Sequence, residues 1–477
     1  MSLVKIAPAG DRGILVELGD VSAEQLHATA ASLRARPGVI AAIVGHSSVY
    51  VVFESSEAAS KACDGQQKGN HRGHKAHRET QRTCPLCLSE PSVPSVVVPS
   101  PSAVTRLRVS FREEYGPDLP LLGVPRDEFF ARVRDLRLVV RYIGFRGGFG
   151  YLDGWPAEWA LPRRPTSRPR VAAGTFAIAG NVAGFYPLDS PGGWNLLGRT
   201  DQPLLHALQP GDVIGIEPTD EAVPEVRRSV ERPPWSFPLR LIQSPLTMLA
   251  GSEDWSGIAR GIPPGGPFDD VAAAHANLAV GNEASAPILE SALTGPRAIA
   301  EEALIASWFG ADAEVRVAGR IVSDPSQFEV KRGEEISIGR LTGGARGYLA
   351  AGRDGGEIRP LDRDDRLTIH TIAGPHDTSL RELVCEVTPQ LDRVGIRMRA
   401  ITPLRLDAPA SLPSCGMQRG TLQLHPDGSV VAMGPDHPVT GGYLQPMTVV
   451  WSERWKLGQL APGERVRFVA QSLSPYT

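Results

Sequence analysis

The chain has 477 residues, of which 42% are hydrophobic and 22% charged, which is ordinary for a globular protein with room for two to four domains. Its 50 basic and 53 acidic residues nearly cancel, so it lacks the basic surface typical of proteins that bind nucleic acid or anionic membranes. Five cysteines do not make a disulfide framework, and no apolar run is long enough to cross a bilayer. We therefore expect a cytoplasmic protein with neither a nucleic-acid nor a membrane partner.

The first 55 residues predict a small α/β unit. Residues 13–18 and 48–53 are rich in β-branched and apolar side chains and are expected to be strands. Between them, Ser22-Ala-Glu-Gln25 has the spacing of a capping box, which predicts a helix running towards Arg36.

The rest of the chain predicts a mainly β fold, because 50 glycines and 42 prolines recur between short apolar runs. Two helices are expected, at about 126–137 and 268–280, and residues 138–142 are expected to be a strand. The predicted segments are an α/β domain at 1–55, a linker or insertion at 56–104, a barrel domain at 105–220, a linker at 221–237, and two β-rich domains at 238–372 and 373–477.

Two absent dipeptides limit the chemistry of this chain. It has no Gly-Lys pair, hence no P-loop lysine for nucleotide phosphates, and no Met-Lys pair of the kind that accepts biotin. If the function of this chain involves ATP or biotin, we expect another polypeptide to carry that cofactor.

The insertion contains the only pattern suggestive of a metal. His71, His74 and His77 precede Cys84 and Cys87, and zinc accepts mixed histidine and cysteine ligands. A single Cys-x-x-Cys in a polar segment is weak evidence, so we expect no metal site, with zinc as the minor alternative.

Glycine is dense between Gly144 and Thr200, where close backbone approach and anion-binding turns are possible. Arg163, Arg164 and Arg199 are candidates to clamp a carboxylate or phosphate. On spacing alone, tight barrel turns with surface arginines explain the same pattern at least as well.

Several motifs of the first half carry a family resemblance: Ala9-Gly-Asp-Arg12, Tyr115-Gly-Pro-Asp-Leu119, Gly144-Phe-Arg-Gly-Gly-Phe-Gly-Tyr-Leu152, Leu161-Pro-Arg-Arg164 and Ser190-Pro-Gly-Gly-Trp194. They resemble the family called allophanate hydrolase subunit 1, also known as the kinase-A inhibitor family and as the B-type subunit of 5-oxoprolinase. The resemblance covers most of residues 1–220, apart from the insertion.

The second half carries its own set of motifs: Gly261-Ile-Pro263, Ala276-Asn-Leu278, Leu289-Glu290, Ala345-Arg-Gly-Tyr-Leu-Ala350, Asp392-Arg-Val-Gly-Ile-Arg397, Asp436-His437, Thr440-Gly-Gly-Tyr443 and Pro462-Gly-Glu-Arg-Val-Arg-Phe468. Residues 238–477 thereby resemble allophanate hydrolase subunit 2, also known as the C-type subunit of 5-oxoprolinase. The resemblance implies cyclophilin-like β-barrel domains and a fusion of the two subunits.

The implied activity is the ATP-dependent opening of 5-oxo-L-proline to L-glutamate by a hydrolase complex that includes a separate, TIM-barrel-like third subunit. One alternative is the carboxyltransferase part of a biotin-dependent urea or amide carboxylase of the urea amidolyase type, with biotin on another chain. A second is a regulatory protein resembling the histidine-kinase inhibitors of the first family.

The amide chemistry implied by the resemblance requires proton transfer and stabilisation of an oxyanion. The candidates for acid–base roles are Asp269, Glu290, Asp392, Asp436 and His437, and those for substrate or anion contact are Arg393, Arg397, Gly441 and Gly442, beside the three arginines of the first half. A salt bridge or a cap is, for each one, an equally good explanation. The chain also departs from the family pattern, with Gly265, Cys415 and Pro438-Val439 where hydrogen-bonding residues are common.

Overall fold

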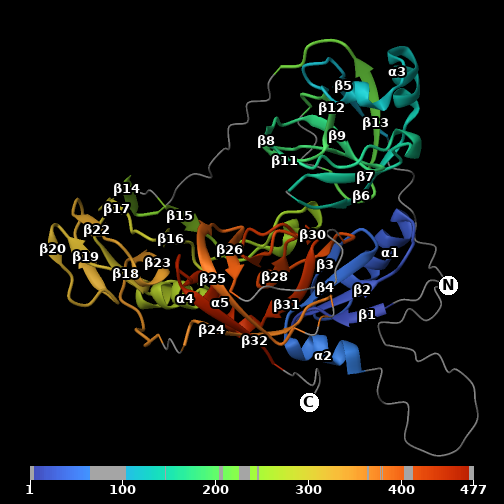
Figure 1. The fold of residues 1–477 in the computed structure, drawn as a ribbon. Coiled ribbons are helices and arrows are strands. Elements are labelled where there is room, and N and C mark those ends of the chain that lie inside the picture. The colour runs from blue at the N-terminus through green and yellow to red at the C-terminus, as the bar shows by residue number, and fades with distance from the viewer. Residues whose placement is uncertain are drawn as a thin grey trace, which may run out of the picture.

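The computed structural model describes residues 5–64, 104–145, 147–202, 208–224, 237–243, 246–361, 365–376, 378, 380–401 and 412–471. It is mostly β and contains two closed seven-stranded barrels (Figure 1). Along these residues no helix is both long and apolar enough to span a membrane.

The N-terminal domain is a four-stranded antiparallel sheet in the order β1-β2-β4-β3. Its elements are β1 (Lys5–Pro8), β2 (Gly13–Glu17), α1 (Ala23–Arg34), β3 (Val39–Val44), β4 (Ser48–Phe53) and α2 (Ser56–Asp64). The predicted capping box is confirmed, because the Ser22 hydroxyl accepts from Gln25 N at 3.2 Å while Gln25 Oε1 accepts from Ser22 N at 3.0 Å.

Helix α2 corrects the predicted start of the insertion. Residues 56–64 belong to the segment predicted to be a linker or insertion, yet they form a helix whose Ala59 is buried in the domain core. The alanines within an otherwise polar stretch supply this contact, which composition alone does not reveal. The remainder of the insertion, from residue 65 to 103, lies outside the described residues.

The N-terminal sheet is buried on both faces. One face packs Ile14, Val16, Val49, Val51 and Phe53 into the domain's own core together with α1 and α2. The other face belongs to a cluster shared with the second half of the chain: Ala9, Leu15, Ala41, Ile43, Tyr50 and Val52 pack with Ile258, Cys415 and Val439. Strand β4, buried at all six positions, has the continuous apolar pattern expected of a strand covered on two sides.

The first barrel follows, and Figure 1 shows it standing apart from the centre of the molecule. Its elements are β5 (Thr105–Ser110), η1 (Leu119–Leu122), α3 (Arg126–Asp135), β6 (Leu138–Ile143), β7 (Gly150–Asp153), η2 (Ala157–Trp159), β8 (Arg168–Val171), β9 (Thr175–Ala179), β10 (Val182–Phe185), β11 (Ser190–Gly192), β12 (Asn195–Arg199) and β13 (Val213–Thr219). The helix and strand predicted at 126–142 are thus confirmed.

The middle domain pairs two five-stranded sheets with one helix. Its elements are β14 (Leu239–Gln243), β15 (Thr247–Ala250), η4 (Trp255–Arg260), α4 (Asp270–Ala279), β16 (Ile288–Ala292), β17 (Arg297–Ala300), β18 (Leu304–Asp312), β19 (Val315–Val317), β20 (Arg320–Ile321), β21 (Phe328–Val330), β22 (Glu335–Ile338) and β23 (Thr342–Gly352). Helix α4 is the helix predicted at 268–280.

The second barrel closes the described chain and lies beside the N-terminal domain (Figure 1). Its elements are β24 (Thr368–Ala373), β25 (Glu382–Leu391), β26 (Gly395–Ala400), β27 (Cys415–Gly416), β28 (Thr421–Leu424), β29 (Ser429–Met433), β30 (Thr440–Gly441), β31 (Leu444–Val449), η5 (Trp451–Glu453), α5 (Arg454–Gly458) and β32 (Arg465–Ala470).

The two barrels have the same topology. Around each circle the strands run first, seventh, second, third, fifth, fourth, sixth in chain order, and the first and last strands pair in parallel. Their closing turns also match: Gly211 N donates to Val140 O in the first barrel as Gly463 N donates to Val387 O in the second, each at 2.8 Å. No fixed-period repeat was visible in the sequence.

Because the N-terminal sheet and the second half share one apolar cluster, we expect the two halves to associate even when no peptide bond connects them. Expressed as separate chains, residues 1–224 and 237–477 should co-elute in size-exclusion chromatography. Ile43→Asp should abolish co-elution, because it places an unpaired charge in a cluster where Ile43 is 2% exposed.

The control is Glu24→Lys, which changes a charge on the exposed side of α1 and should leave co-elution intact. Circular dichroism of each variant checks that the first half remains folded. Independent elution of the unmodified halves would contradict the interface.

Candidate functional site

Residues 9–12 of the first half contact the second barrel directly. Gly10 has φ 125°, and a Cβ there would lie 2.3 Å from Gln418 Nε2, so the approach requires glycine. Asp11 Oδ2 accepts a hydrogen bond from Trp451 N at 2.8 Å. Burial raises the pKa of Asp11, although the hydrogen bond from Trp451 N acts to lower it. The Arg12 guanidinium lies 4.1 Å from the centre of the Trp451 ring.

The glycine-rich loop between β6 and β7 makes a second contact with the other half. A Cβ on Gly144 would lie 1.9 Å from Thr440 Oγ1, and Gly148 N donates to Arg260 O at 3.1 Å. Phe145, between them, has φ 63°, a conformation that costs energy for a residue with a side chain. The motifs that carry the family resemblance in the first half thus meet those of the second half.

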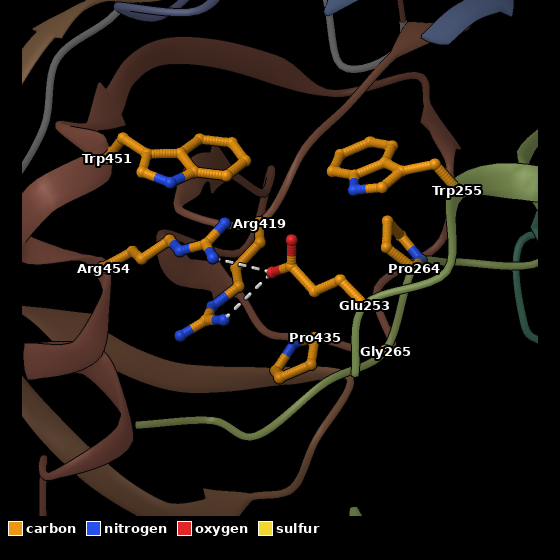
Figure 2. A pocket seen from close by; sticks show the side chains of 8 residues that line it. All are labelled: Glu253, Trp255, Pro264, Gly265, Arg419, Pro435, Trp451 and Arg454. Carbon is orange, nitrogen blue, oxygen red and sulfur yellow. Dashed lines mark ion pairs between the residues drawn. The ribbon is translucent and has the colours of Figure 1, made fainter. Parts of the chain in front are cut away.

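A small pocket lies in this region (Figure 2). It is lined by Glu253, Trp255, Pro264, Gly265, Arg419, Pro435, Trp451 and Arg454. The indoles of Trp255 and Trp451 have ring centres 6.5 Å apart and planes inclined by 24°. Figure 2 shows them side by side above the Glu253 carboxylate, so they form one flat apolar wall.

The polar side of the pocket is built from opposite charges. Glu253 Oε1 lies 2.8 Å from Arg454 Nη2 and 3.5 Å from Arg419 Nη1. Both guanidiniums also face Asp270, at 2.7 Å and 3.6 Å. Burial would raise the pKa of Asp270, but the charges of Arg419 and Arg454 outweigh it and lower that pKa. Two carboxylates therefore balance two arginines whose side chains are only 6% and 8% exposed.

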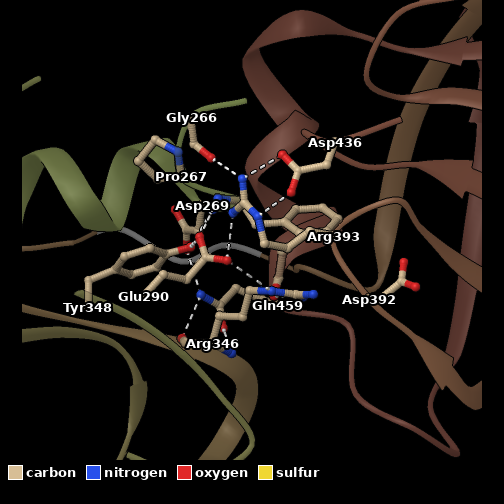
Figure 3. Close-up of polar contacts among 12 residues, drawn as sticks. Gly266, Pro267, Asp269, Glu290, Arg346, Tyr348, Asp392, Arg393, Asp436 and Gln459 are labelled. Atoms are coloured by element: carbon tan, nitrogen blue, oxygen red, sulfur yellow. Dashed lines mark hydrogen bonds and ion pairs between the residues drawn. The ribbon is translucent and has the colours of Figure 1, made fainter. Parts of the chain in front are cut away.

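A second charged network lies close by and joins the middle domain to the second barrel (Figure 3). Arg393 donates to Glu290 Oε1 at 2.8 Å and, through two nitrogens, to both Asp436 oxygens at 2.8 and 2.9 Å. It also donates to Gly266 O at 2.7 Å. Burial opposes ionisation of Arg393, but the two carboxylates raise its pKa.

Glu290 is held from every side. Its Oε2 accepts from Phe268 N at 2.6 Å and from the Tyr348 hydroxyl at 3.0 Å, and Arg346 Nε lies 3.7 Å from Oε1. Burial and the neighbouring carboxylate raise the pKa of Tyr348 well above its ordinary value. Glu290 is 3% exposed and has no open side towards a ligand.

The structure gives Asp269 and Asp392 local structural contacts. Asp269 Oδ1 accepts from Ala272 N at 2.8 Å, capping α4, and its Oδ2 accepts from Gln459 at 2.6 Å. Asp392 Oδ1 accepts from Val394 N and Gly395 N, at 2.8 and 3.1 Å, in the turn before β26. In Figure 3 its carboxylate points away from the Arg393 network.

His437 is buried beside Asp436. Its Nδ1 lies 2.9 Å from Pro438 O, and burial lowers its pKa to about 4, so the ring is neutral at pH 7. Its Nε2 has no hydrogen-bond partner within the described part of the chain. Asp436 and His437 directly follow Pro435, which lines the pocket, and their acid–base assignment stays a prediction.

The three arginines of the first half are not brought to this pocket. Arg163 is exposed on the first barrel, and Arg164 Nη1 lies 3.4 Å from Asp118 Oδ1. Arg199 lies over the Tyr115 ring at 4.0 Å and donates to a backbone carbonyl. None of the three lines the pocket, and their role in contacting a substrate or anion stays a prediction.

The remaining predicted contacts are explained by local packing. Arg397 donates to the Ser429 hydroxyl at 3.1 Å. A Cβ on Gly441 would lie 2.4 Å from Gln423 Nε2, and one on Gly442 would lie 2.8 Å from Leu412 O. Close approach of neighbours thus accounts for the glycines.

Sequence reasoning missed the residues that line the pocket. Its charged and aromatic members come from the loop before η4, from the start of η4, from the loop after β27, and from η5 and α5. The available signal was weak: two of the eight tryptophans, Trp255 and Trp451, each lie within three residues of a charged pocket residue, Glu253 and Arg454.

No cluster of possible metal ligands occurs among the residues that the structure describes. The histidines and cysteines between His71 and Cys87 lie outside these residues.

The fold and the interface define a protein of two halves. Each half ends in a seven-stranded barrel. Residues 4–211 match the family model described as carboxyltransferase domain, subdomain C and D, and residues 260–360 and 356–470 match the model for subdomain A and B. The chain belongs to this carboxyltransferase-domain family, as a fusion of its two parts.

The curated relatives are components of complexes and larger enzymes. The chain is 36% identical over 121 residues to the B-type subunit of 5-oxoprolinase from Escherichia coli O157:H7, covering 23% of this chain and about half (55%) of that relative's length. It is 26% identical to the C-type subunit of 5-oxoprolinase from Escherichia coli K12, covering 45% of this chain and 84% of the relative. A putative urea carboxylase of Emericella nidulans is 27% identical, over 46% of this chain and 23% of that protein.

A solved structure has the same fold throughout. The crystal structure of TTHA0988 superposes with a TM-score of 0.76 at 24% identity, covering 97% of this chain and all of that one. The arrangement of both halves in one polypeptide is thus shared with a solved protein.

Removing the Arg393 side chain should destabilise the second half. Arg393→Ala leaves Glu290 buried beside fewer positive charges, and breaking a buried ion pair costs about 3–5 kcal/mol. We expect a loss of that order in the free energy of unfolding measured with urea. The matched control, Arg399→Ala, removes an arginine that is 73% exposed and should change stability by less than about 1 kcal/mol. Equal losses in the two variants would contradict the assignment.

The contribution of Asp270 to the free energy of unfolding should depend on pH. Its folded pKa is lowered below 3.8, so the contribution is fully present above about pH 4 and is lost as pH falls through the folded value. Asp270→Asn should therefore cost about 2 kcal/mol at pH 7, and the difference from the unmodified chain should narrow as the pH falls below about 4. Urea denaturation across this range measures it. Asp354→Asn, at an exposed position, is the control, and a pH-independent difference for Asp270→Asn would refute the ion-pair explanation.

Proposed function

We propose that this chain is the fused B-type and C-type subunits of an ATP-dependent 5-oxoprolinase, which opens 5-oxo-L-proline to L-glutamate together with a separate third subunit. One observation carries the proposal: the two halves resemble the B-type and C-type components of that enzyme, and Asp11 and Arg12 of the first half contact Trp451, which lines the pocket of Figure 2. Ring opening adds one water across the lactam C–N bond, which gives an amine and a second carboxylate.

A partner chain is part of the proposal because of what this chain lacks. Amide bonds are poor electrophiles, and the family reaction uses ATP to activate them. No Gly-Lys pair occurs in the sequence, so the P-loop route to phosphate binding is closed to this chain. We therefore assign ATP use to the complex, with the TIM-barrel-like third subunit as the partner.

The second candidate is the carboxyltransferase component of a biotin-dependent urea or amide carboxylase. The family description and the similarity to a putative urea carboxylase favour it. It is the weaker candidate, because the match covers a small part of that larger protein. Biotin would then be carried by another chain, since no Met-Lys pair is present here. No contact among the described residues specifically favours a kinase-inhibitor role.

Reconstitution tests the proposal. The purified chain alone should neither hydrolyse ATP nor form glutamate from 5-oxoproline, and adding the third subunit should produce both, with one coupled to the other. Steady-state assays of phosphate and glutamate release measure this. The control replaces 5-oxoproline with urea and adds a biotin carrier.

Two results would contradict the proposal. ATP hydrolysis by the chain alone would remove the argument for a partner. Turnover of urea, but not of 5-oxoproline, by the assembled proteins would favour the second candidate.

A further inference from the structure

We propose that the pocket below Trp255 and Trp451 binds the N–H edge of a small, neutral, planar amide, with Glu253 Oε2 as the acceptor of that N–H. The inference deepens the proposed function and rests on it, since the lactam of 5-oxoproline is such an amide. It assigns Glu253 a direct contact with the substrate, a residue to which neither the resemblance nor the comparisons point.

The two oxygens of Glu253 have different environments. Oε1 faces the guanidiniums of Arg419 and Arg454, at 3.5 and 2.8 Å. Among the described residues, no hydrogen bond or ion pair is made by Oε2, and Figure 2 shows this oxygen pointing towards the indoles. The arginines fix the carboxylate in place, so Oε2 is a preorganised hydrogen-bond acceptor at the pocket.

The shape of the pocket favours a flat group. The indole planes differ by only 24°, and their ring centres lie 6.5 Å apart, so the two rings offer nearly parallel flat surfaces to the pocket. Pro264 and Pro435 add further apolar surface. An amide plane that packs against this wall can direct its N–H edge at Oε2 while its faces contact apolar carbon.

The charge of the pocket favours a neutral group. Glu253 and Asp270 face Arg419 and Arg454, and the nearby Arg12 is offset by Asp11, so the acidic and basic groups around the pocket are equal in number. A ligand carboxylate placed between them would add an uncompensated negative charge, whereas an amide would not. We infer that the amide enters and that a substrate carboxylate stays outside the pocket.

Residues of the first half hold the Trp451 side of the apolar wall in place. Asp11 accepts from Trp451 N, and Arg12 and Arg454 lie 4.1 and 3.8 Å from the centre of its ring. Docking of the first half therefore holds one wall of the pocket, and we expect amide binding to need both halves.

Ligand binding to the full chain tests the inference without any assay of turnover. Isothermal titration compares 5-oxoproline with N-methyl-5-oxoproline, in which a methyl group replaces the N–H hydrogen. The unmodified chain should bind the N-methyl compound about tenfold to a hundredfold more weakly, the effect of losing a hydrogen bond to a charged acceptor. This comparison needs no variant, so it holds even if a substitution disturbs folding.

Glu253→Gln supplies the second arm. Its amide oxygen must face the two guanidiniums, which leaves an NH₂ donor towards the ligand in place of an acceptor. Binding of 5-oxoproline should weaken by a similar factor, and the difference between the two ligands should vanish, as a double-mutant cycle requires. Glu283→Gln, at an exposed position, is the matched control and should bind both ligands as the unmodified chain does.

The outcomes separate this inference from the proposed function. Equal binding of both ligands, or unchanged binding by Glu253→Gln, overturns the pocket assignment while leaving the proposed function intact. So does absence of binding by a chain whose reconstituted complex opens 5-oxoproline. Absence of both binding and turnover overturns the proposed function, and the inference with it.

Discussion

The N-terminal sheet has to bury two apolar faces, and only one of them is covered by its own helices. Leu15, Ile43, Tyr50 and Val52 form the second face, and they reach burial only against residues of the other half such as Cys415. Burying a large apolar side chain contributes about 1.5–3 kcal/mol, so this face strongly favours docking. Docking in turn brings residues 9–12 onto the second barrel, where Gly10 permits the close approach and Asp11 and Arg12 reach Trp451. A hydrophobic contact outside the pocket thus supports one of its walls, at Trp451.

Local elements of this fold could be predicted from the sequence, because their causes are local. The capping box at Ser22 and the strand at 48–53 depend on neighbouring residues and are found where expected. The continuous apolar run of β4 is also typical of a strand that is buried on both faces. Such a run does not indicate which residues cover the second face. The start of the insertion was misplaced because a short helix such as α2 is stabilised mainly by tertiary contact, here through Ala59.

The two barrels share one topology although the sequence has no fixed-period repeat. Strand β9 begins at Thr175 and β28 at Thr421, each directly after a glycine, and Pro-Gly precedes the last strand of both barrels. Turns that need glycine retain it, while strand positions accept many apolar residues, so only the turns are similar. Loop lengths between these turns differ, which removes any fixed period. The family resemblance implied barrels in both regions, and both close with seven strands.

The residues of the candidate site fall into two groups: those that sequence motifs indicate, and those that only the folded chain brings together. Acidic residues chosen from the family motifs, such as Glu290 and Asp269, are engaged in buried pairs and caps that fix the surrounding loops. Glu253 and Trp451, almost two hundred residues apart, meet only in the folded chain, so no pattern of spacing reveals them. Because Trp451 is held by Asp11 and Arg12 from the first half, binding of a ligand on its indole and docking of the halves stabilise each other. Thermodynamic linkage makes that coupling reciprocal: a ligand that prefers the ordered wall must tighten the association of the halves by the same factor.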